Sequence, residues 1–410
     1  MQSFLSRSRL LLAAALLAFA ATAQAQISNQ NSAHTITTAV PILTLSPDAR
    51  SASLGEAGVA TSPDANSAYF NPGKLGFVPY KYAASLSYSP WLRAITDDMS
   101  LSHVSGYGKI GQRSALGASL TYFDLGTIDY RTNTNFPNGS FSPKEYAFTV
   151  SYGQQLTEKF GVGISARYIR SNLVGAINGN DAQPGNAAAV DLGAYYSSDA
   201  TIGTGLYNLS FGGSISNIGN KITYTDPQNP SFLPTTLKLG TAITREIDQY
   251  NKITLVFDAT KLLVPSPYYE EGVSNNDPRI VAENDARNGQ GIVSGIFSSF
   301  GDAPGGFKEE LREINLSTGL EYNYNDLLYA RGGYFYEAPD KGDRQYVSLG
   351  LGVRYQVFGI DGTYLVPTGT VQNNPLAQTI RISLHFNLNK LADAFNESGV
   401  GGTSDDTPSN

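Results

Sequence analysis

Several residue types that carry protein chemistry are missing or scarce in this chain of 410 residues. It has no cysteine, which excludes disulfide bonds, an acylated cysteine anchor and thiolate chemistry. Its three histidines, His34, His103 and His385, are far apart, and no HExxH pattern, phosphate-binding loop or GxSxG motif occurs. A transition-metal site would lack its usual ligands. We therefore predict no catalytic site, no cofactor and no metal site.

Charge and long apolar runs are also scarce. Charged residues make up 15% of the chain, against about 25% in a typical soluble protein, and the net charge of −7 argues against a nucleic-acid partner. Beyond the N-terminus no run approaches 18 apolar residues, so no transmembrane helix is predicted. At the N-terminus, Arg7 and Arg9 precede an apolar run and a small-x-small Ala23-Gln24-Ala25. This pattern predicts a secretory signal peptide over residues 1–25.

The main pattern of the remaining chain is an alternation with a period of two. Apolar residues alternate with small or polar ones over segments such as 160–168 and 347–355. The segments are about ten residues long, which is the length that a tilted strand needs to cross a bilayer. We count about fourteen of them, centred near residues 85, 102, 120, 149, 165, 192, 212, 240, 255, 318, 331, 350, 361 and 383.

The links between these segments alternate in length. Short links fall near residues 109–113, 156–159, 199–205, 245–251, 323–326 and 356–359, and longer ones near 129–142, 171–185, 218–234, 261–310 and 337–343. Outer-membrane barrels have short periplasmic turns and long external loops, whereas a soluble β-sandwich has no reason to alternate in this way. We predict an all-β fold, a transmembrane antiparallel β-barrel of about 14 strands over residues 81–389, with two short helices in the longest loop.

The face of the strands opposite the apolar one carries balanced charges. It holds five acids and five bases, namely Glu145, Arg167, Asp191, Lys238, Asp258, Glu321, Arg331, Arg354, Asp361 and Arg381. Charges in a water-poor lumen must be paired or solvated. We interpret the set as a charge network in an obstructed lumen, with a merely water-filled lumen as the alternative.

Two segments do not fit the strand pattern. Residues 26–80 have no sustained period but contain apolar stretches, and a segment of this size before a barrel can fold into the lumen as a hatch or plug. Asn71-Pro72-Gly73 near its end is predicted to be the turn that seats this hatch. Residues 390–410 are polar and rich in Gly, which predicts a flexible tail.

The sequence also contains weaker candidates for functional sites. Ser383 and His385 share the lumen face and could be imagined as the dyad of a lipid-modifying hydrolase, but we interpret His385 as a polar lumen residue. Three acids in the long loop could bind calcium but lack the spacing of a calcium loop: Glu270, Glu271 and Asp277. The apolar corner at Trp91, Leu92 and Arg93 could be an anchor at the membrane interface or a contact for a partner protein.

Specific motifs resemble known barrel families. Asn71-Pro72-Gly73-Lys74-Leu75 is similar to the Asn-Pro-Ala hatch turn of the FadL-like outer-membrane family, with Gly in place of Ala. A closer resemblance is to the PorV family of the type IX secretion system of Bacteroidetes. It is carried by the segments Thr38–Phe77, Ser87–Arg93 ("SYSPWLR") and Ser299–Leu311 ("SFGDAPGGFKEEL").

The resemblance implies a non-enzymatic role in the outer membrane of a Gram-negative bacterium, with the loops facing the cell exterior. Such proteins bind the C-terminal domain of secreted cargo at a translocon barrel and deliver it to a cell-surface sortase, in a membrane containing lipopolysaccharide. The candidate partner contacts are Trp91, Leu92, Arg93, Asp302, Pro304 and Phe307. The alternative is a FadL-type transporter of hydrophobic small molecules.

Overall fold

The computed structural model describes residues 34–91, 96–132, 134–173, 183–224, 230–368 and 379–388. The predicted signal peptide and C-terminal tail lie outside these residues, as do Leu92 and Arg93.

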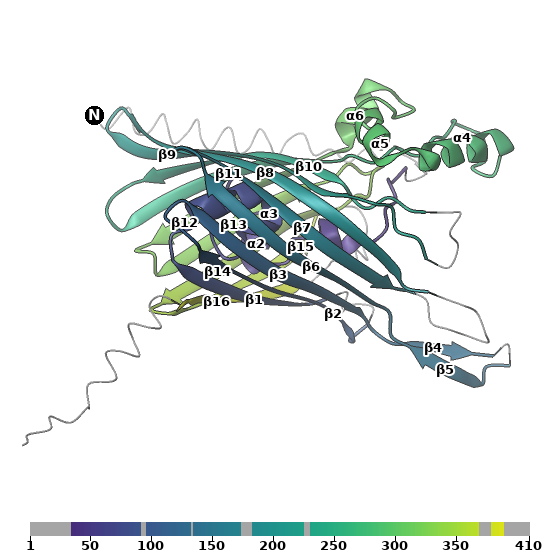
Figure 1. Ribbon diagram of the computed structural model, residues 1–410, viewed down its shortest axis with the longest axis horizontal. Coiled ribbons are helices and arrows are strands. Elements are labelled where there is room, and N and C mark those ends of the chain that lie inside the picture. Colours follow the sequence, from purple (N-terminus) through teal and green to yellow (C-terminus); the bar gives the residue numbers. More distant parts are fainter. Residues whose placement is uncertain are drawn as a thin grey trace, which may run out of the picture. The chain divides into compact units, whose positions relative to one another are not determined.

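Fourteen antiparallel strands close into a barrel, as predicted (Figure 1). The first and last strands pair with each other, for example at Ala84 and Phe386, and the other neighbours follow chain order. The barrel strands are β1 (Tyr82–Pro90), β2 (Met99–Lys109), β3 (Ser114–Leu125), β6 (Lys144–Gln155), β7 (Phe160–Asn172), β8 (Gly185–Ile202), β9 (Gly205–Gly219), β10 (Thr236–Glu246), β11 (Asn251–Leu262), β12 (Ile314–Tyr324), β13 (Leu328–Tyr336), β14 (Gln345–Tyr355), β15 (Phe358–Pro367) and β16 (Ile380–Asn387). A hairpin of β4 (Ile128–Arg131) and β5 (Pro137–Phe141), which was not predicted, extends one long loop.

The predicted faces of the strands are confirmed. Along β7, for example, Ile164 is 48% exposed on the outer side whereas Ser165 is 1% exposed on the lumen side. The ten charged residues assigned to the lumen lie on the inner face. Eight of them are buried, and Lys238 and Arg354 are partly exposed.

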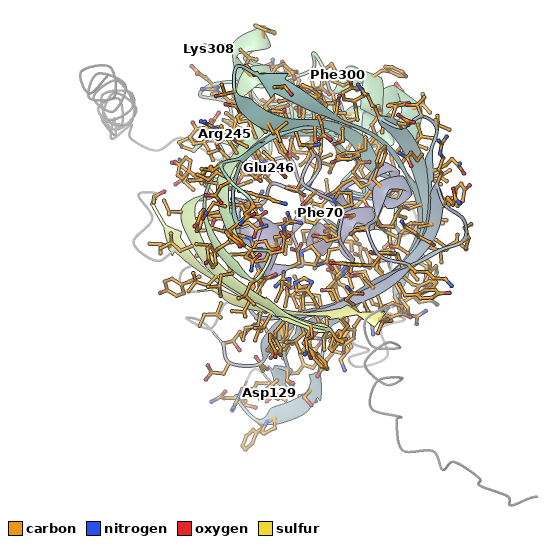
Figure 2. The ribbon with its side chains drawn as sticks, turned by 90° about the vertical axis from the view of Figure 1, so that its left-hand side faces the viewer. Phe70, Asp129, Arg245, Glu246, Phe300 and Lys308 are labelled. Atoms are coloured by element: carbon orange, nitrogen blue, oxygen red, sulfur yellow. The ribbon has the colours of Figure 1, made fainter. Side chains whose placement is uncertain are left out.

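The N-terminal segment occupies the lumen and forms the predicted plug. Its elements are η1 (Pro41–Thr44), α2 (Ala49–Ser53), α3 (Ser67–Phe70) and η2 (Pro72–Phe77). Figure 2 looks along the barrel and places Phe70 inside the ring of strands. The α2 helix packs on β13 to β16, and η2 packs on β6 to β8. These two groups of strands lie on opposite sides of the barrel order, so the plug spans the lumen from wall to wall.

The apolar core lies between the plug and the barrel wall. Leu54 and Val59 of the plug cluster with Val256 of β11, and Leu75 of η2 clusters with Tyr107 of β2. Full burial of a Leu or Val side chain contributes about 1.5–3 kcal/mol. Contacts at both walls therefore hold the plug in place.

The longest loop, between β11 and β12, carries three helices. They are α4 (Pro278–Gly289), α5 (Ile292–Ser298) and α6 (Phe307–Arg312). The first two agree with the helices predicted near 278–287 and 295–300, whereas α6 was not predicted. None of the helices in the described part of the chain is long and apolar enough to cross a membrane.

Candidate functional site

The hatch turn lies directly against the barrel wall. Asn71 Oδ1 accepts a hydrogen bond from the Gly73 amide at 3.0 Å, and its Nδ2 donates to the carbonyl of Ala194 in β8 at 2.8 Å. A Cβ atom added to Gly163 in β7 would lie 2.3 Å from the Pro72 carbonyl carbon, and one added to Gly193 would lie 2.2 Å from Asn71 Oδ1. The backbone of the turn can approach the wall this closely because the wall has no side chains there.

A buried chain of charges joins the plug to one side of the wall. Arg50 of α2 contacts Glu321 of β12 at 3.1 Å and Asp64 of the plug at 2.9 Å. Glu321 also accepts from Arg331 of β13 at 2.6 Å, and Arg331 contacts Asp361 of β15 at 2.9 Å. The plug therefore supplies a cation to a network that the sequence pattern had assigned to the wall alone.

Arg354 completes this network within the wall. Its Nη2 atom lies 2.6 Å from Asp361 Oδ2, and its side chain is 25% exposed. Its hydrogen bonds and ion pair with described residues all lie within the wall, so Arg354 offers a comparison with Arg50.

Other predicted lumen charges also meet the plug. Asp258 of β11 accepts hydrogen bonds from the backbone amides of Gly58 and Val59 at 2.7 and 3.0 Å. Arg381 of β16 lies 3.2 Å from Glu56 of the plug.

By contrast, two pairs lie within the wall. Arg167 pairs with Asp191 at 2.8 Å, and Glu145 accepts a hydrogen bond from Ser171 at 2.7 Å. The network thus has one part that forms ion pairs and hydrogen bonds with the plug and one part whose ion pair and hydrogen bond lie within the wall.

The imagined hydrolase dyad is not joined by a hydrogen bond. Ser383 Oγ lies 2.7 Å from Ser87 Oγ and accepts from the Ala49 amide at 2.8 Å. His385 Nε2 lies 2.7 Å from Asp361 Oδ2. Ser383 therefore belongs to the contacts between wall and plug, whereas His385 pairs with Asp361 within the wall.

The acids considered for calcium have separate roles. Glu270 accepts a hydrogen bond from the Tyr268 hydroxyl at 2.9 Å, and Asp277 caps α4 by accepting from the Arg279 amide at 2.9 Å. The described residues contain no group of His, Cys, Asp or Glu that could hold a metal ion.

The interpretation of Trp91 as an anchor at the membrane interface is wrong, because its side chain does not lie on the outer surface of the barrel. Its side chain is 6% exposed, meets Phe123 edge-on with ring centroids 6.1 Å apart, and lies 5.8 Å from the guanidinium of Arg381. Ser85, Ser87 and Ser89 of β1 are buried on the lumen side, and Trp91 has the same parity. It therefore points into the barrel.

The candidate contacts in the long loop behave differently from one another. Asp302 accepts from the Ser266 amide at 3.2 Å and its carbonyl accepts from Arg287 at 2.8 Å, so it shapes the loop. Pro304 is half-buried, whereas Phe307 is 78% exposed. Of these residues, Phe307 has most of its side chain free for a contact outside the chain.

A compact ion cluster holds the long loop on the barrel rim. Lys261 Nζ contacts Glu310 and Glu313 at 2.9 and 2.7 Å, and Lys341 Nζ contacts Glu309 and Glu313 at 2.5 and 3.0 Å. Burial raises the pKa of Glu309, but the bonds from Lys341 and the Gly305 amide outweigh it and leave that pKa lowered. The four-residue spacing of Glu309 and Glu313 signals one helical face, although the sequence alone does not reveal the two lysines.

Above the plug, at the long-loop end, the lumen contains a cavity of about 560 Å³. Its floor includes Glu56 and Tyr69 of the plug, and apolar parts of its wall come from Trp91, Phe335 and Leu365. Residues 35–38 of the N-terminal segment border it. Such a partly apolar hollow with a few polar groups is the usual form of a binding site.

The cationic groups of this cavity are unequally neutralised. Arg344 pairs with Glu337 at 2.7 Å, and Arg381 pairs with Glu56. Lys238 lies over the Phe70 ring at 5.4 Å, but none of the described residues forms an ion pair or hydrogen bond with its ammonium group. The buried Nε of Arg381 also lacks a hydrogen-bond partner among these residues. The cavity can therefore accept an acidic group.

Comparisons with known proteins place these features in context. A family model described as "Type IX secretion system protein PorV" matches residues 27–269, more than half of the chain. No curated protein matches the sequence.

Several solved barrels are distantly similar. The Pseudomonas putida toluene transporter TodX is 10% identical with a TM-score of 0.46, covering 87% of this chain and 100% of its own. The Ralstonia pickettii toluene transporter TbuX is 11% identical with a TM-score of 0.42, covering 83% and 97%. A Pseudomonas aeruginosa FadL homologue is 10% identical with a TM-score of 0.40, covering 87% and 100%. Similarity at this level carries no argument about what the chain binds.

Proposed function

The chain belongs to the PorV family of type IX secretion system proteins, and we propose that it is the outer-membrane shuttle of that system. In this role it binds the C-terminal domain of secreted cargo at the translocon barrel and delivers it to the cell-surface sortase. Its long loops face the cell exterior. The role is one of binding and transfer and requires no catalytic residue.

The observation that carries this proposal is the cavity with Lys238, whose ammonium group has no ion-pair or hydrogen-bond partner among the described residues. It lies at the long-loop end, where cargo outside the cell would meet the barrel. A domain at the C-terminal end of its chain always carries a free carboxylate, in addition to its acidic side chains. Such a carboxylate can form a charge-assisted hydrogen bond with Lys238 while neighbouring apolar side chains contact Trp91 and Phe335.

Replacing Lys238 with Met tests this assignment because it removes the charge and keeps most of the volume. A hydrogen bond to a charged group contributes about 1.5–3 kcal/mol, which corresponds to about a 10- to 150-fold loss of affinity. The affinity of the purified barrel for an isolated cargo C-terminal domain is measured by calorimetry. Lys159→Met, an exposed lysine between β6 and β7, is the matched control and should bind as the unmodified protein does.

Equal affinity of Lys238→Met and the unmodified protein, with the barrel intact by its heat-dependent gel mobility, would remove the cavity as the cargo site. A C-terminally amidated cargo domain separates the two kinds of acid. Amidation should weaken binding as much as Lys238→Met if the terminal carboxylate is the group bound, and it should leave affinity unchanged if a side-chain acid is bound.

Transport of hydrophobic small molecules is the second candidate function, favoured by the apolar part of the cavity wall at Trp91, Phe335 and Leu365. It requires a path past the plug, which contacts opposite sides of the barrel. Purified protein that carries a small hydrophobic molecule and has no affinity for cargo domains would favour transport over the shuttle.

A further inference from the structure

The outer side of the long loop presents an unusual apolar surface. Five side chains of α5, α6 and the segment between them are mostly exposed: Val293 (66%), Phe297 (73%), Phe300 (52%), Phe307 (78%) and Leu311 (52%). We call these residues the loop patch. Contiguous exposed apolar surface of this kind marks contact with a membrane or another molecule.

The opposite sides of the two helices are fixed to the protein. Glu309 and Glu310 of α6 are buried in the ion cluster with Lys341 and Lys261, whereas Phe307 and Leu311 lie on the other face, four residues apart. Gly295 of α5 packs against the Phe232 ring. A Cβ atom added to Gly295 would lie 3.2 Å from that ring. The orientation of the loop patch away from the protein is thus set by contacts on the inner faces.

The position of Lys261 shows on which side of the wall α6 lies. Asp258 of β11 points into the lumen, where it accepts hydrogen bonds from the plug. Alternation along the strand therefore places Phe257, Ala259 and Lys261 on the outer face, and Phe257 is 44% exposed there. Because Glu310 binds Lys261, one of the contacts that anchor α6 to the rim lies on the outer side of the wall.

Figure 2 agrees with this placement. Phe300 and Lys308 lie at the periphery of the ring of strands, whereas Phe70 lies within it. The loop patch is therefore not positioned over the lumen. Lys261 follows Phe257 by four positions in β11, a distance of about 13 Å along the strand.

The outer wall next to the loop patch is apolar and faces lipid. Exposed apolar residues on the outer faces of the neighbouring strands are Leu239 of β10, Leu255 and Phe257 of β11, and Leu316 and Leu320 of β12. The loop patch continues this surface beyond the ends of the strands. A patch made for a soluble partner would not need to border the lipid-facing wall.

We propose that α5 and α6 form an anchor in the membrane interface, with the loop patch buried among lipid chains at the long-loop side of the bilayer. Short helices with one apolar face bind membranes in this way, and the exposed Lys308 of α6 can reach lipid phosphates from the same position. This assigns Phe307 to lipid rather than to a partner protein. The anchor does not depend on the proposed cargo site.

The absence of cysteine from the chain makes a direct test possible. Phe297→Cys and Phe307→Cys each give one attachment site for a polarity-sensitive fluorophore in the full-length protein. Val281→Cys is the matched control, since Val281 is 42% exposed on α4, which projects beyond the strand ends in Figure 1. The labelled proteins are reconstituted alone into vesicles of phosphatidylethanolamine and phosphatidylglycerol.

We expect the labels at 297 and 307 to be quenched by nitroxide-bearing lipids and to be several-fold less sensitive to aqueous iodide than the label at 281. Equal iodide sensitivity at all three positions would overturn the proposal. If shielding at 297 and 307 then appeared only on adding the translocon barrel, the loop patch would be a protein contact. Cargo affinity is measured separately, so this outcome leaves the shuttle proposal standing.

Discussion

Removing the positive charge of Arg50 should release the plug without disrupting the barrel. Arg50→Met loses the ion pair with Glu321, which joins α2 to β12, and the ion pair with Asp64, which lies within the plug. The methionine keeps much of the side-chain volume, so the effect reports on charge rather than on a cavity.

The size of the effect follows from the partners that remain. Removing one member of a buried ion pair costs about 3–5 kcal/mol, because the other is left as a buried charge. Glu321 keeps Arg331 at 2.6 Å, and Asp64 is 25% exposed, so part of this cost is relieved. A reduced cost of about 2–4 kcal/mol would raise the ratio of released to seated plug about 30- to 900-fold.

Single-channel recording in planar bilayers measures this ratio as the fraction of time spent in conducting states. Arg354→Met is the control, because Arg354 pairs with Asp361 within the wall. We expect frequent conducting events for Arg50→Met and the baseline of the unmodified protein for Arg354→Met. Silent Arg50→Met channels, or equal opening of the two variants, would refute the view that this network seats the plug.

Three further outcomes can be checked with simple assays. Asn71→Ala combined with Pro72→Ala should raise antibiotic leakage into cells before it lowers the amount of assembled barrel. The reason is that the turn contacts β7 and β8 without forming part of them. Unchanged leakage would show that the turn does not help to close the lumen. The lowered pKa of Glu309 predicts that its contribution to loop anchoring is present above its usual value of 4.5 and is lost as the pH falls through the lowered value. Protease cleavage of the long loop should therefore accelerate below about pH 4.5 in the unmodified protein but not in Glu309→Gln, and parallel pH profiles would contradict this assignment. Trp91, the only tryptophan, lines the cavity, so its emission should shift when a tryptophan-free cargo domain binds, and a constant spectrum at saturation would argue against binding there.

The barrel could be predicted because each strand obeys one local rule. Ile164 faces outward and Ser165 inward because neighbouring side chains of a strand point to opposite faces, and a bilayer makes this alternation visible in the sequence. The same rule gives the correct orientation of Trp91, because Trp91 continues the alternation of Ser85, Ser87 and Ser89, which face the lumen. Assigning Trp91 to a loop hides this orientation, since the alternation applies only within a strand.

The contacts of the plug could not be predicted in this way. Arg50 and Glu321 are separated by 271 positions, and residues 26–80 have no period that assigns their side chains to a face. The helix α6 is only six residues long and is held by lysines from β11 and from the loop after β13. Lys238 could be placed in the lumen from the sequence, but only the structure shows that its ammonium group has no ion-pair or hydrogen-bond partner among the described residues.

The shuttle function is tested most directly by the fate of cargo in cells. A strain lacking the gene is complemented with the unmodified protein, with Lys238→Met or with Lys159→Met, and the fraction of cargo that retains its C-terminal domain is measured by immunoblot. We expect unprocessed, unsecreted cargo to accumulate in the deletion strain and with Lys238→Met, while Lys159→Met restores processing. Normal processing and secretion in the deletion strain would contradict the shuttle function.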